Sequence, residues 1–285
     1  MSNQSSPPRP HWLRAKAPAG ENYEDVLRLV ESRKLHTVCQ SANCPNIGEC
    51  WRERTATFMI LGGICTRNCR FCAVDHGAPS AVDEDEPRRV AEAVAHLNLK
   101  HAVITSVTRD DLPDGGAYIF ARTIELVREA TPKCTVEVLI PDFQGSEEAL
   151  ATVLASAPDV LNHNVETVER LYPLIRPQAI YFRSVDLIRA VRRLSPGTRT
   201  KSGLMVGVGE TTEELIAVFS DLRDADCNFL TVGQYLAPSS HHAPIERYCT
   251  PEEFDDLKAR ALAMGFAHVE SAPLVRSSYH AAQSM

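Results

Sequence analysis

Three features are missing from this sequence of 285 residues, and each absence excludes a class of protein. No stretch of 18 or more consecutive apolar residues occurs, so no segment is expected to cross a membrane. Basic residues are not in excess, since 30 Lys and Arg face 37 Asp and Glu for a net charge of −7, which argues against nucleic-acid binding. The first residues, MSNQSSPPRPHWLRAK, lack the apolar core of a secretory signal peptide. We therefore expect a cytoplasmic protein.

Cysteine is the residue type that stands out among those present. The sequence has nine, and six of them lie in two short segments, CQSANCPNIGECW at 39–51 and CTRNCRFC at 65–72. We call these segments the first and the second cysteine motif. Cytoplasmic thiols stay reduced, so clustered cysteines in such a protein indicate a metal site or redox chemistry rather than a disulfide framework.

Composition and pattern divide the chain into four parts. Residues 1–20 are rich in Ser and Pro and predict a flexible N-terminal arm. Residues 21–57 form an N-terminal extension, which begins with a predicted amphipathic helix over 21–34 and carries the first cysteine motif on a loop. The main domain is expected over 58–265, and residues 266–285 form a C-terminal extension.

Short apolar runs alternate with helical patterns through the main domain. Strands are predicted near 58–61, 102–106, 135–140, 159–163, 201–207 and 229–234. Helices are predicted between and after them, near 86–98, 116–130, 146–155, 184–194, 211–224 and 251–263. This alternation indicates βαβ units and a parallel sheet. About six units predict an α/β barrel of the TIM type, complete or partly open, and a doubly wound open sheet is the alternative that the pattern leaves.

Polar residues gather where several predicted strands end. Thr105 and Ser106 end one strand, Asn162 ends another, and Asn164 and Glu166 follow directly. In barrels of this type the chemistry lies at the carboxyl ends of the strands, so we expect these side chains near the site, where they could bind the ribose or methionine part of a cofactor. Their alternative role is to cap the next helix.

The second cysteine motif follows the first predicted strand, at the same end of the barrel. Its thiols, Cys65, Cys69 and Cys72, are spaced C-x3-C-x2-C, whereas zinc sites show paired C-x2-C units and four ligands. Three thiolates on a [4Fe–4S] cluster leave one iron open for S-adenosylmethionine, whose reductive cleavage yields a 5′-deoxyadenosyl radical. The spacing, with Phe71 before the last cysteine, resembles the radical S-adenosylmethionine superfamily. A structural zinc is the alternative reading.

The first cysteine motif also has three thiols, Cys39, Cys44 and Cys50, spaced C-x4-C-x5-C. By the same argument it could bind a second cluster that has one iron without a sulfur ligand. Plant-type ferredoxins space their cysteines C-x4-C-x2-C with a distant fourth, so the match to them is partial. A second cluster would relay electrons, bind substrate or give up material.

Further motifs resemble the lipoyl synthase family over almost the whole chain, from about Trp12 to Ala281. They are CPNIGECW, TATFMILG before CTRNCRFCAV, TSVTRDDLPDGGA (105–117), PDFQG (141–145), NHNVETV (162–168), KSGLMVGVGE (201–210), GQYLAPS (233–239) and RSSYHA (276–281). C-x3-C-x2-C alone is typical of the superfamily, whereas C-x4-C-x5-C together with RSSY is specific to this family. Gly62-Gly63 stands where Gly-Asp is expected, away from any ligand position.

The resemblance implies a partial (β/α)6 TIM-like barrel with terminal extensions, S-adenosylmethionine and two [4Fe–4S] clusters. The implied ligands of the radical-generating cluster are Cys65, Cys69 and Cys72, and those of the auxiliary cluster are Cys39, Cys44, Cys50 and Ser278. The implied reaction adds sulfur at C6 and C8 of an octanoyl chain on a lysine, with the auxiliary cluster as sulfur donor. The implied partners are an octanoylated lipoyl carrier domain, from glycine cleavage H protein or 2-oxoacid dehydrogenase E2, and a reductase, ferredoxin or flavodoxin that supplies electrons.

Two basic residues and three other functions stay open at this point. Arg176 could bind a carboxylate of S-adenosylmethionine or form a surface salt bridge, and Lys201 could face the cavity or the rim. The alternative functions are another sulfur-inserting radical enzyme of the biotin synthase type, a two-cluster electron carrier, and a zinc-stapled interaction module.

Overall fold

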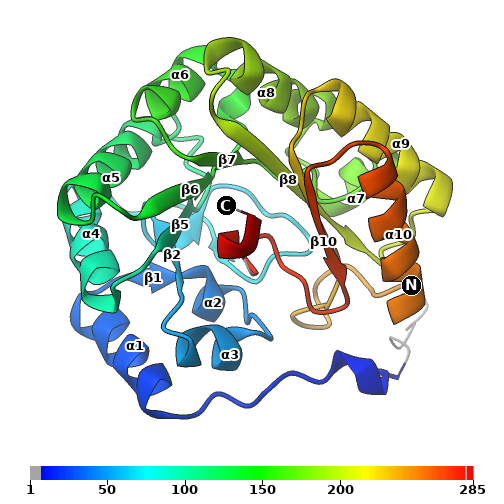
Figure 1. The fold of residues 1–285 in the computed structure, drawn as a ribbon, viewed down its shortest axis with the longest axis horizontal. Helices are drawn as coiled ribbons and strands as arrows, with labels where there is room; N and C mark the ends of the chain where they lie inside the picture. Colours follow the sequence, from blue (N-terminus) through cyan, green and yellow to red (C-terminus); the bar gives the residue numbers. More distant parts are fainter. Residues whose placement is uncertain (1–7, 280, 285) are drawn as a thin grey trace.

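The computed structural model describes residues 8–279 and 281–284, and its centre is a curved sheet of eight strands (Figure 1). Along the sheet the order is β1-β2-β5-β6-β7-β8-β9-β10, and every neighbouring pair is parallel except β1 with β2. The bounds are His36–Thr37 for β1, Thr57–Ile60 for β2, His101–Ser106 for β5, Thr135–Leu139 for β6, Val160–Asn162 for β7, Arg199–Val206 for β8, Phe229–Gln234 for β9 and His268–Ala272 for β10. In the described chain β1 and β10 are the two edges, so the barrel is partly open.

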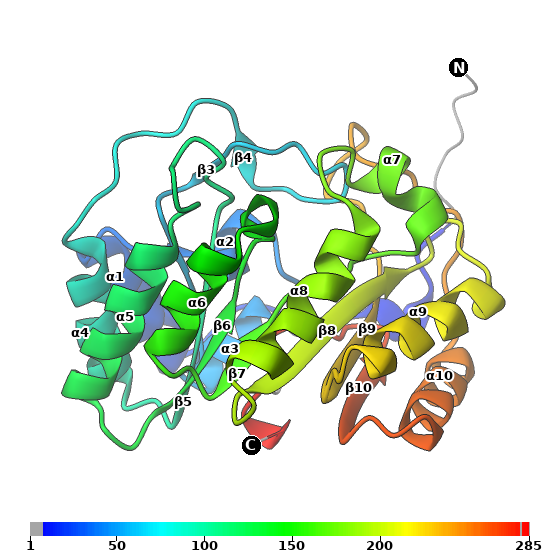
Figure 2. The same cartoon turned by 90° about the horizontal axis from the view of Figure 1, so that it is seen from above.

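Helices cover the outer face of this sheet and leave its inner face to the site (Figures 1 and 2). They are α4 (Glu86–Leu97), α5 (Ala117–Ala130), α6 (Glu147–Ala155), α8 (Tyr181–Leu194), α9 (Thr212–Asp224) and α10 (Pro251–Ala263). This arrangement confirms the partial TIM-like barrel and excludes the doubly wound sheet, which would carry helices on both faces. Among the described residues no helix has the length and apolar character needed to cross a bilayer.

Local sequence signals explain where the barrel elements begin. Thr211 and Thr250 each form a capping box at the start of α9 and α10, in which the side chain accepts a hydrogen bond from the backbone three residues on. Pro251 follows Thr250 at the first position of α10, where its missing N–H costs nothing. Most strand residues are buried, because both faces of the sheet are covered; Phe58 and Ile104 are fully inaccessible.

The N-terminal extension differs from the predicted loop at the first cysteine motif. After α1 (Glu21–Ser32), the motif contains two short helices, α2 (Val38–Ser41) and α3 (Ile47–Arg52). Thr37 starts α2 by accepting a hydrogen bond from the Gln40 backbone amide. Pro45 lies between the two helices and separates them, so the prediction of a loop was wrong.

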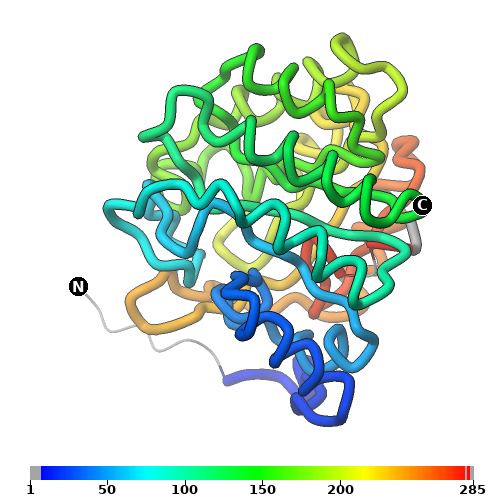
Figure 3. Tube along the Cα trace, turned by 90° about the vertical axis from the view of Figure 1, so that its left-hand side faces the viewer, coloured from blue at the N-terminus to red at the C-terminus, as the bar shows by residue number. Residues whose placement is uncertain are grey.

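Residues 8–20, part of the predicted N-terminal arm, pack against the rest of the described chain. They cross the open side of the barrel, opposite the green helices α5 and α6 (Figures 1 and 3). The short 3₁₀ helix His11–Leu13 buries Leu13, and Lys16 forms an ion pair with Glu49 of α3 at 3.2 Å. A Cβ on Gly48 would lie 2.8 Å from the Lys16 carbonyl oxygen, so glycine allows this segment to pack against α3. Residues 1–7 lie outside the described part of the chain.

The C-terminal extension contributes a strand that the sequence did not predict. β10 pairs with β9 in parallel and extends the sheet beyond the expected boundary at residue 265. After β10 the chain turns across the end of the barrel where the strands begin, and there the 3₁₀ helix Ala281–Ser284 lies (Figures 1 and 2). A Cβ on Gly233 of β9 would lie 2.1 Å from the carbonyl oxygen of Val275, so this glycine admits the returning segment.

Candidate active site

A cavity of about 670 Å³ runs through the inside of the barrel. It is lined by residues from the carboxyl end of β5 and from the amino end of β2, where Thr57 is the first residue. All six cysteines of the two motifs line it, as does Ser278 (Cys39, Cys44, Cys50, Cys65, Cys69 and Cys72). The structure therefore brings the two thiol triads, which are predicted to act together, to one enclosed space.

A buried arginine fixes the second cysteine motif on the barrel. Arg67 donates from Nε and Nη2 to Asp110 at 2.6 and 2.9 Å, and Nη2 also donates to Asp142 at 2.6 Å. Burial opposes ionisation of Asp142, but the Arg67 hydrogen bond and charge outweigh it and lower the pKa of Asp142 to about 2. Asp110 thus serves to hold the loop, and its neighbour Asp111 is bound to Arg109 at 2.9 Å. The two aspartates do not form an acid/base pair.

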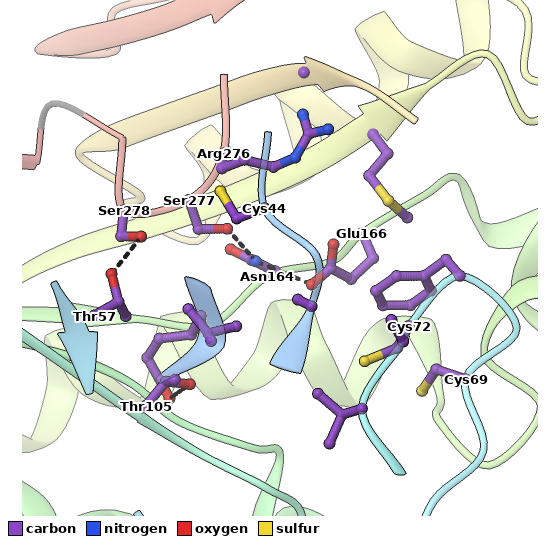
Figure 4. A pocket seen from close by; sticks show the side chains of 18 of the residues that line it. Cys44, Thr57, Cys69, Cys72, Thr105, Asn164, Glu166, Arg276, Ser277 and Ser278 are labelled. Carbon is purple, nitrogen blue, oxygen red and sulfur yellow. Dashed lines mark hydrogen bonds between the residues drawn. The ribbon is translucent and has the colours of Figure 1, made fainter. Parts of the chain in front are cut away.

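The thiols of the second motif face the cavity, as Figure 4 shows for Cys69 and Cys72. Burial raises the pKa of Cys72 to about 12 and also raises the pKa of Cys69, so both thiols bind protons tightly. Two backbone amides, of Arg67 and Thr108, point at the Cys65 sulfur at 3.4 and 3.3 Å. Loading of a metal group onto such thiols must release protons, and the amides are placed to stabilise a thiolate.

Three side-chain contacts hold residues 274–279, which include RSSY, against the first cysteine motif and the start of β2. The Asn46 amide donates to the Leu274 carbonyl at 2.7 Å, the Tyr279 hydroxyl to Glu49 at 3.2 Å, and the Thr57 hydroxyl to Ser278 Oγ at 2.8 Å. These contacts hold Ser278 above Thr57 in the wall of the cavity that Cys44 also lines (Figure 4).

Burial raises the pKa of the thiols in the first motif as it does in the second. Burial raises the pKa of Cys39 to about 11 and that of Cys50 to about 12. Within the described chain no three His, Cys, Asp or Glu side chains gather as the ligands of one metal ion do. A cubane offers a separate iron to each thiolate, so three cysteines spread over one cavity wall fit a cluster without meeting at a point. The donor set, soft sulfur from three cysteines on each side, is the one that iron–sulfur clusters use.

The polar strand-end residues are brought into the cavity, with one exception. Asn164 donates from Nδ2 to Glu166 Oε1 at 2.9 Å and to Ser277 Oγ at 2.5 Å (Figure 4). Glu166 has a left-handed backbone, with φ of 66°, and burial raises the pKa of its carboxyl group. Thr105 binds the Leu139 carbonyl at 2.9 Å, and the buried Ser106 hydroxyl has no partner. Such strain and unpaired polarity are typical of ligand sites.

Asn162 is the exception, and the structure corrects its expected place. Its amide donates to Glu137 of β6 at 3.2 Å and it does not line the cavity. Glu137 is fully buried and also pairs with Lys201 of β8 at 2.9 Å. Lys201 therefore lies neither in the cavity wall nor at the rim, since it neutralises a carboxylate inside the barrel.

Arg176 lines the cavity and is buried, so the surface salt bridge is excluded. Its Nη1 donates to the carbonyl oxygens of Asn164 and Val165 at 3.0 and 3.2 Å and thereby holds the chain that carries Glu166. Three side chains with clear roles in the site escaped the sequence reading: Arg67, Thr57 and Ser277. The three residues belong to the motifs CTRNCRFC, TATFMILG and RSSYHA. Within a motif, however, no spacing distinguishes a supporting hydroxyl or arginine from its neighbours.

Comparison with known proteins agrees with the fold and the cysteine motif. The Radical SAM superfamily model matches residues 59–222, more than half of the chain. Among solved structures, methylornithine synthase (TM-score 0.54, 14% identity, 74% of this chain and 69% of that one) and the hydrogenase maturase HydG (TM-score 0.57, 14% identity, 74% and 55%) share the fold. The barrel and the match together define a radical S-adenosylmethionine enzyme, which depends on an iron–sulfur cluster and S-adenosylmethionine.

Relatives with higher sequence identity define the family within this class of enzymes. Lipoyl synthase of Chloroflexus aurantiacus (strain ATCC 29366 / DSM 635 / J-10-fl) is 62% identical over 275 residues, which cover 96% of this chain and 90% of the relative. Lipoyl synthase of Roseiflexus sp. (strain RS-1) is 60% identical over 273 residues, with 96% and 91% covered. The chain belongs to the lipoyl synthase family.

Proposed function

We propose that the cavity inserts two sulfur atoms into a protein-bound octanoyl-lysine, at C6 and C8, and converts it to lipoyl-lysine. Membership of the family makes the chain a radical S-adenosylmethionine enzyme of lipoyl synthesis. The finer assignment uses two [4Fe–4S] clusters. Their ligands would be Cys65, Cys69 and Cys72 for the radical-generating cluster and Cys39, Cys44, Cys50 and Ser278 for the auxiliary, sulfur-donating cluster.

One observation carries this proposal: both thiol triads and Ser278 line the same cavity. When bound, the radical-generating cluster and S-adenosylmethionine would supply a carbon radical able to abstract hydrogen, and the auxiliary cluster would supply sulfide. An unactivated methylene cannot be deprotonated by any side chain, so acid–base catalysis could not do this work. The neutralised carboxylates Asp110 and Asp142 agree with a site that needs no general base.

The chain's own residues would bind, orient and exclude water. Apolar walls between the two triads, including Met59, Leu139 and Leu204, suit an acyl chain and keep solvent from a reactive intermediate. Glu166, Asn164, Ser106 and Thr105 offer hydrogen-bonding groups at the second motif and are the proposed contacts of S-adenosylmethionine.

The proposed substrate arrives on a macromolecular partner. An octanoyl chain on a lysine requires a lipoyl carrier domain, for which glycine cleavage H protein and 2-oxoacid dehydrogenase E2 are the candidates. A reductase, ferredoxin or flavodoxin would supply the electron for each cleavage of S-adenosylmethionine.

Anaerobic turnover of the reconstituted enzyme tests the proposal. An octanoyl-lysyl peptide, S-adenosylmethionine and a reductant are mixed with the enzyme, and the peptide mass and 5′-deoxyadenosine are followed. We expect a product in which two hydrogens are replaced by two sulfurs. Formation of 5′-deoxyadenosine without any sulfur-containing peptide would refute sulfur insertion, and no 5′-deoxyadenosine at all would favour an electron carrier.

A further inference from the structure

Thr57 is the first residue of β2 and touches both halves of the proposed auxiliary-cluster site. Its side chain is 5% exposed, and its hydroxyl donates to Ser278 Oγ at 2.8 Å across 221 residues of sequence (Figure 4). Its backbone lies near the Cys39 thiol and acts to lower the pKa of that thiol, against the larger effect of burial. One residue therefore connects a cysteine of the first motif to the serine of RSSY.

We infer that Thr57 is a positioning residue that holds Ser278 Oγ toward the auxiliary cluster, an inference that rests on the function proposed above. A free serine side chain distributes over three staggered rotamers. The Thr57 hydrogen bond selects one of them and leaves the second lone pair of the Ser278 oxygen available for iron. Outer partners of this kind commonly determine how tightly a ligand holds its metal.

Few other contacts of the described residues orient the Ser278 side chain. Ser277, its neighbour, is engaged with Asn164 on the other side of the segment at 2.5 Å. The segment itself is held at Leu274 by Asn46 and at Tyr279 by Glu49, both through contacts outside the serine. Thr57 is thus the described side chain whose hydrogen bond acts on Ser278 Oγ directly.

The test compares Thr57→Val, which keeps the shape and removes the hydroxyl, with Thr57→Ser, which keeps the hydroxyl. Iron release from the loaded enzyme to a chelator is timed, and Mössbauer spectra distinguish the two clusters. We expect Thr57→Val to lose auxiliary-cluster iron about tenfold faster than wild type, with the radical-generating cluster unchanged and with Thr57→Ser close to wild type. Equal or slower loss from Thr57→Val, or failure of Thr57→Ser to restore the rate, overturns the inference.

A second readout does not depend on a bound cluster. Hydrogen exchange of the peptide over residues 272–279 in the cluster-free protein should rise in Thr57→Val and stay low in Thr57→Ser. Thr152→Val on α6 is the matched control: its hydroxyl donates to the Glu148 carbonyl at 3.0 Å and it does not line the cavity, so neither exchange nor iron loss should change. If Thr57→Val does not fold, Thr57→Ala takes its place with the same expectations.

Ser278→Ala separates this inference from the proposed function. If Ser278→Ala loses auxiliary-cluster iron rapidly and Thr57→Val does not, Thr57 has no positioning role and the ligand assignment stands. If Ser278→Ala keeps its iron as well as wild type, the assignment of Ser278 as a ligand fails, and the inference falls with it.

Discussion

At the scale of single residues, Ser278 is the least ordinary proposed ligand. As an oxygen donor to iron, which prefers sulfur, it would form the weakest bond of the proposed set, and this bond would open as sulfur leaves the cluster. The other residues at this scale, such as Arg67 and Asp142, act by neutralising one another.

Replacement of Ser278 by cysteine tests whether release of this ligand is needed. Because a thiolate binds iron more tightly, Ser278→Cys should carry out the first sulfur insertion and slow the second by at least about tenfold, or about 1.4 kcal/mol of barrier. Mass spectrometry of the octanoyl-lysyl peptide reports the ratio of singly to doubly thiolated product. Full two-sulfur turnover at the wild-type rate would contradict a release role.

Asp142→Asn tests the contribution of the Arg67–Asp142 pair to stability. The pKa of Asp142 falls from 3.8 to about 2 in the folded protein, so its carboxylate stabilises the fold by about 2 kcal/mol above pH 4. Since the folded pKa is the lower one, this contribution is lost as the pH falls from about 4 to 2. Urea unfolding should therefore show a wild-type advantage at pH 6 that shrinks toward pH 2.

The control for this series is Asp255→Asn, at an exposed position of α10. Its unfolding free energy should follow that of wild type at every pH. An Asp142→Asn deficit that stays constant between pH 6 and pH 2 would show that Asp142 acts through shape rather than charge.

Single residues also show how much of the site could be predicted from the sequence. Spacing predicted the six thiols, because a cluster needs several sulfur ligands close together in the chain, whereas Ser278 is implied only by the resemblance of RSSY to the family. The places of Asn162 and Lys201 could not be predicted from the sequence. Both point inward from strands, and only the structure shows that Glu137 of β6 binds them. Thr57 has no spacing signature, since its partner lies in a segment that folding alone brings near.

At the scale of elements, the packing of β10 and of the RSSY segment that follows it requires a glycine in β9. The Val275 carbonyl oxygen would lie 2.1 Å from a Cβ at Gly233, so the RSSY segment can enter the barrel only past a residue without a side chain.

Gly233→Ala should move this segment and weaken the auxiliary cluster. Overpacking of this kind costs about 1–3 kcal/mol of folding stability. Iron retention and thermal unfolding of the variant should both fall. Gly197→Ala is the matched control, because nothing lies within 4 Å of a Cβ there, and it should leave both unchanged. Equal behaviour of the two variants would show that the Val275 contact has no importance.

Elements were predicted best where the pattern was long and apolar. The six predicted strands and the helices between them appear within a few residues of their expected positions. β10 was missed because its sequence, HVESA, has only two apolar residues in five positions and lies at a sheet edge. The helices α2 and α3 were missed because four to six residues carry too little helical periodicity to be recognised.

At the scale of the whole molecule, the barrel surrounds a cavity that reaches from the amino ends of its strands to their carboxyl ends. The second cysteine motif lies beyond the carboxyl end of β2, whereas Thr57 and Ser278 mark the amino end of the same strand. The open side between β1 and β10 is crossed by residues 8–20 (Figure 1). The substrate chain would lie between the two triads, with its reacting carbons shielded from water.

This enclosure predicts that the two triads have separable functions. The central measurement is anaerobic single turnover of Cys50→Ala beside wild type, with both 5′-deoxyadenosine and peptide mass recorded. If the first motif only donates sulfur, Cys50→Ala should still cleave S-adenosylmethionine at the second motif and give no thiolated peptide. Thiolated peptide from Cys50→Ala in wild-type yield would contradict the account, because sulfur would then come from elsewhere than the cavity that both triads share.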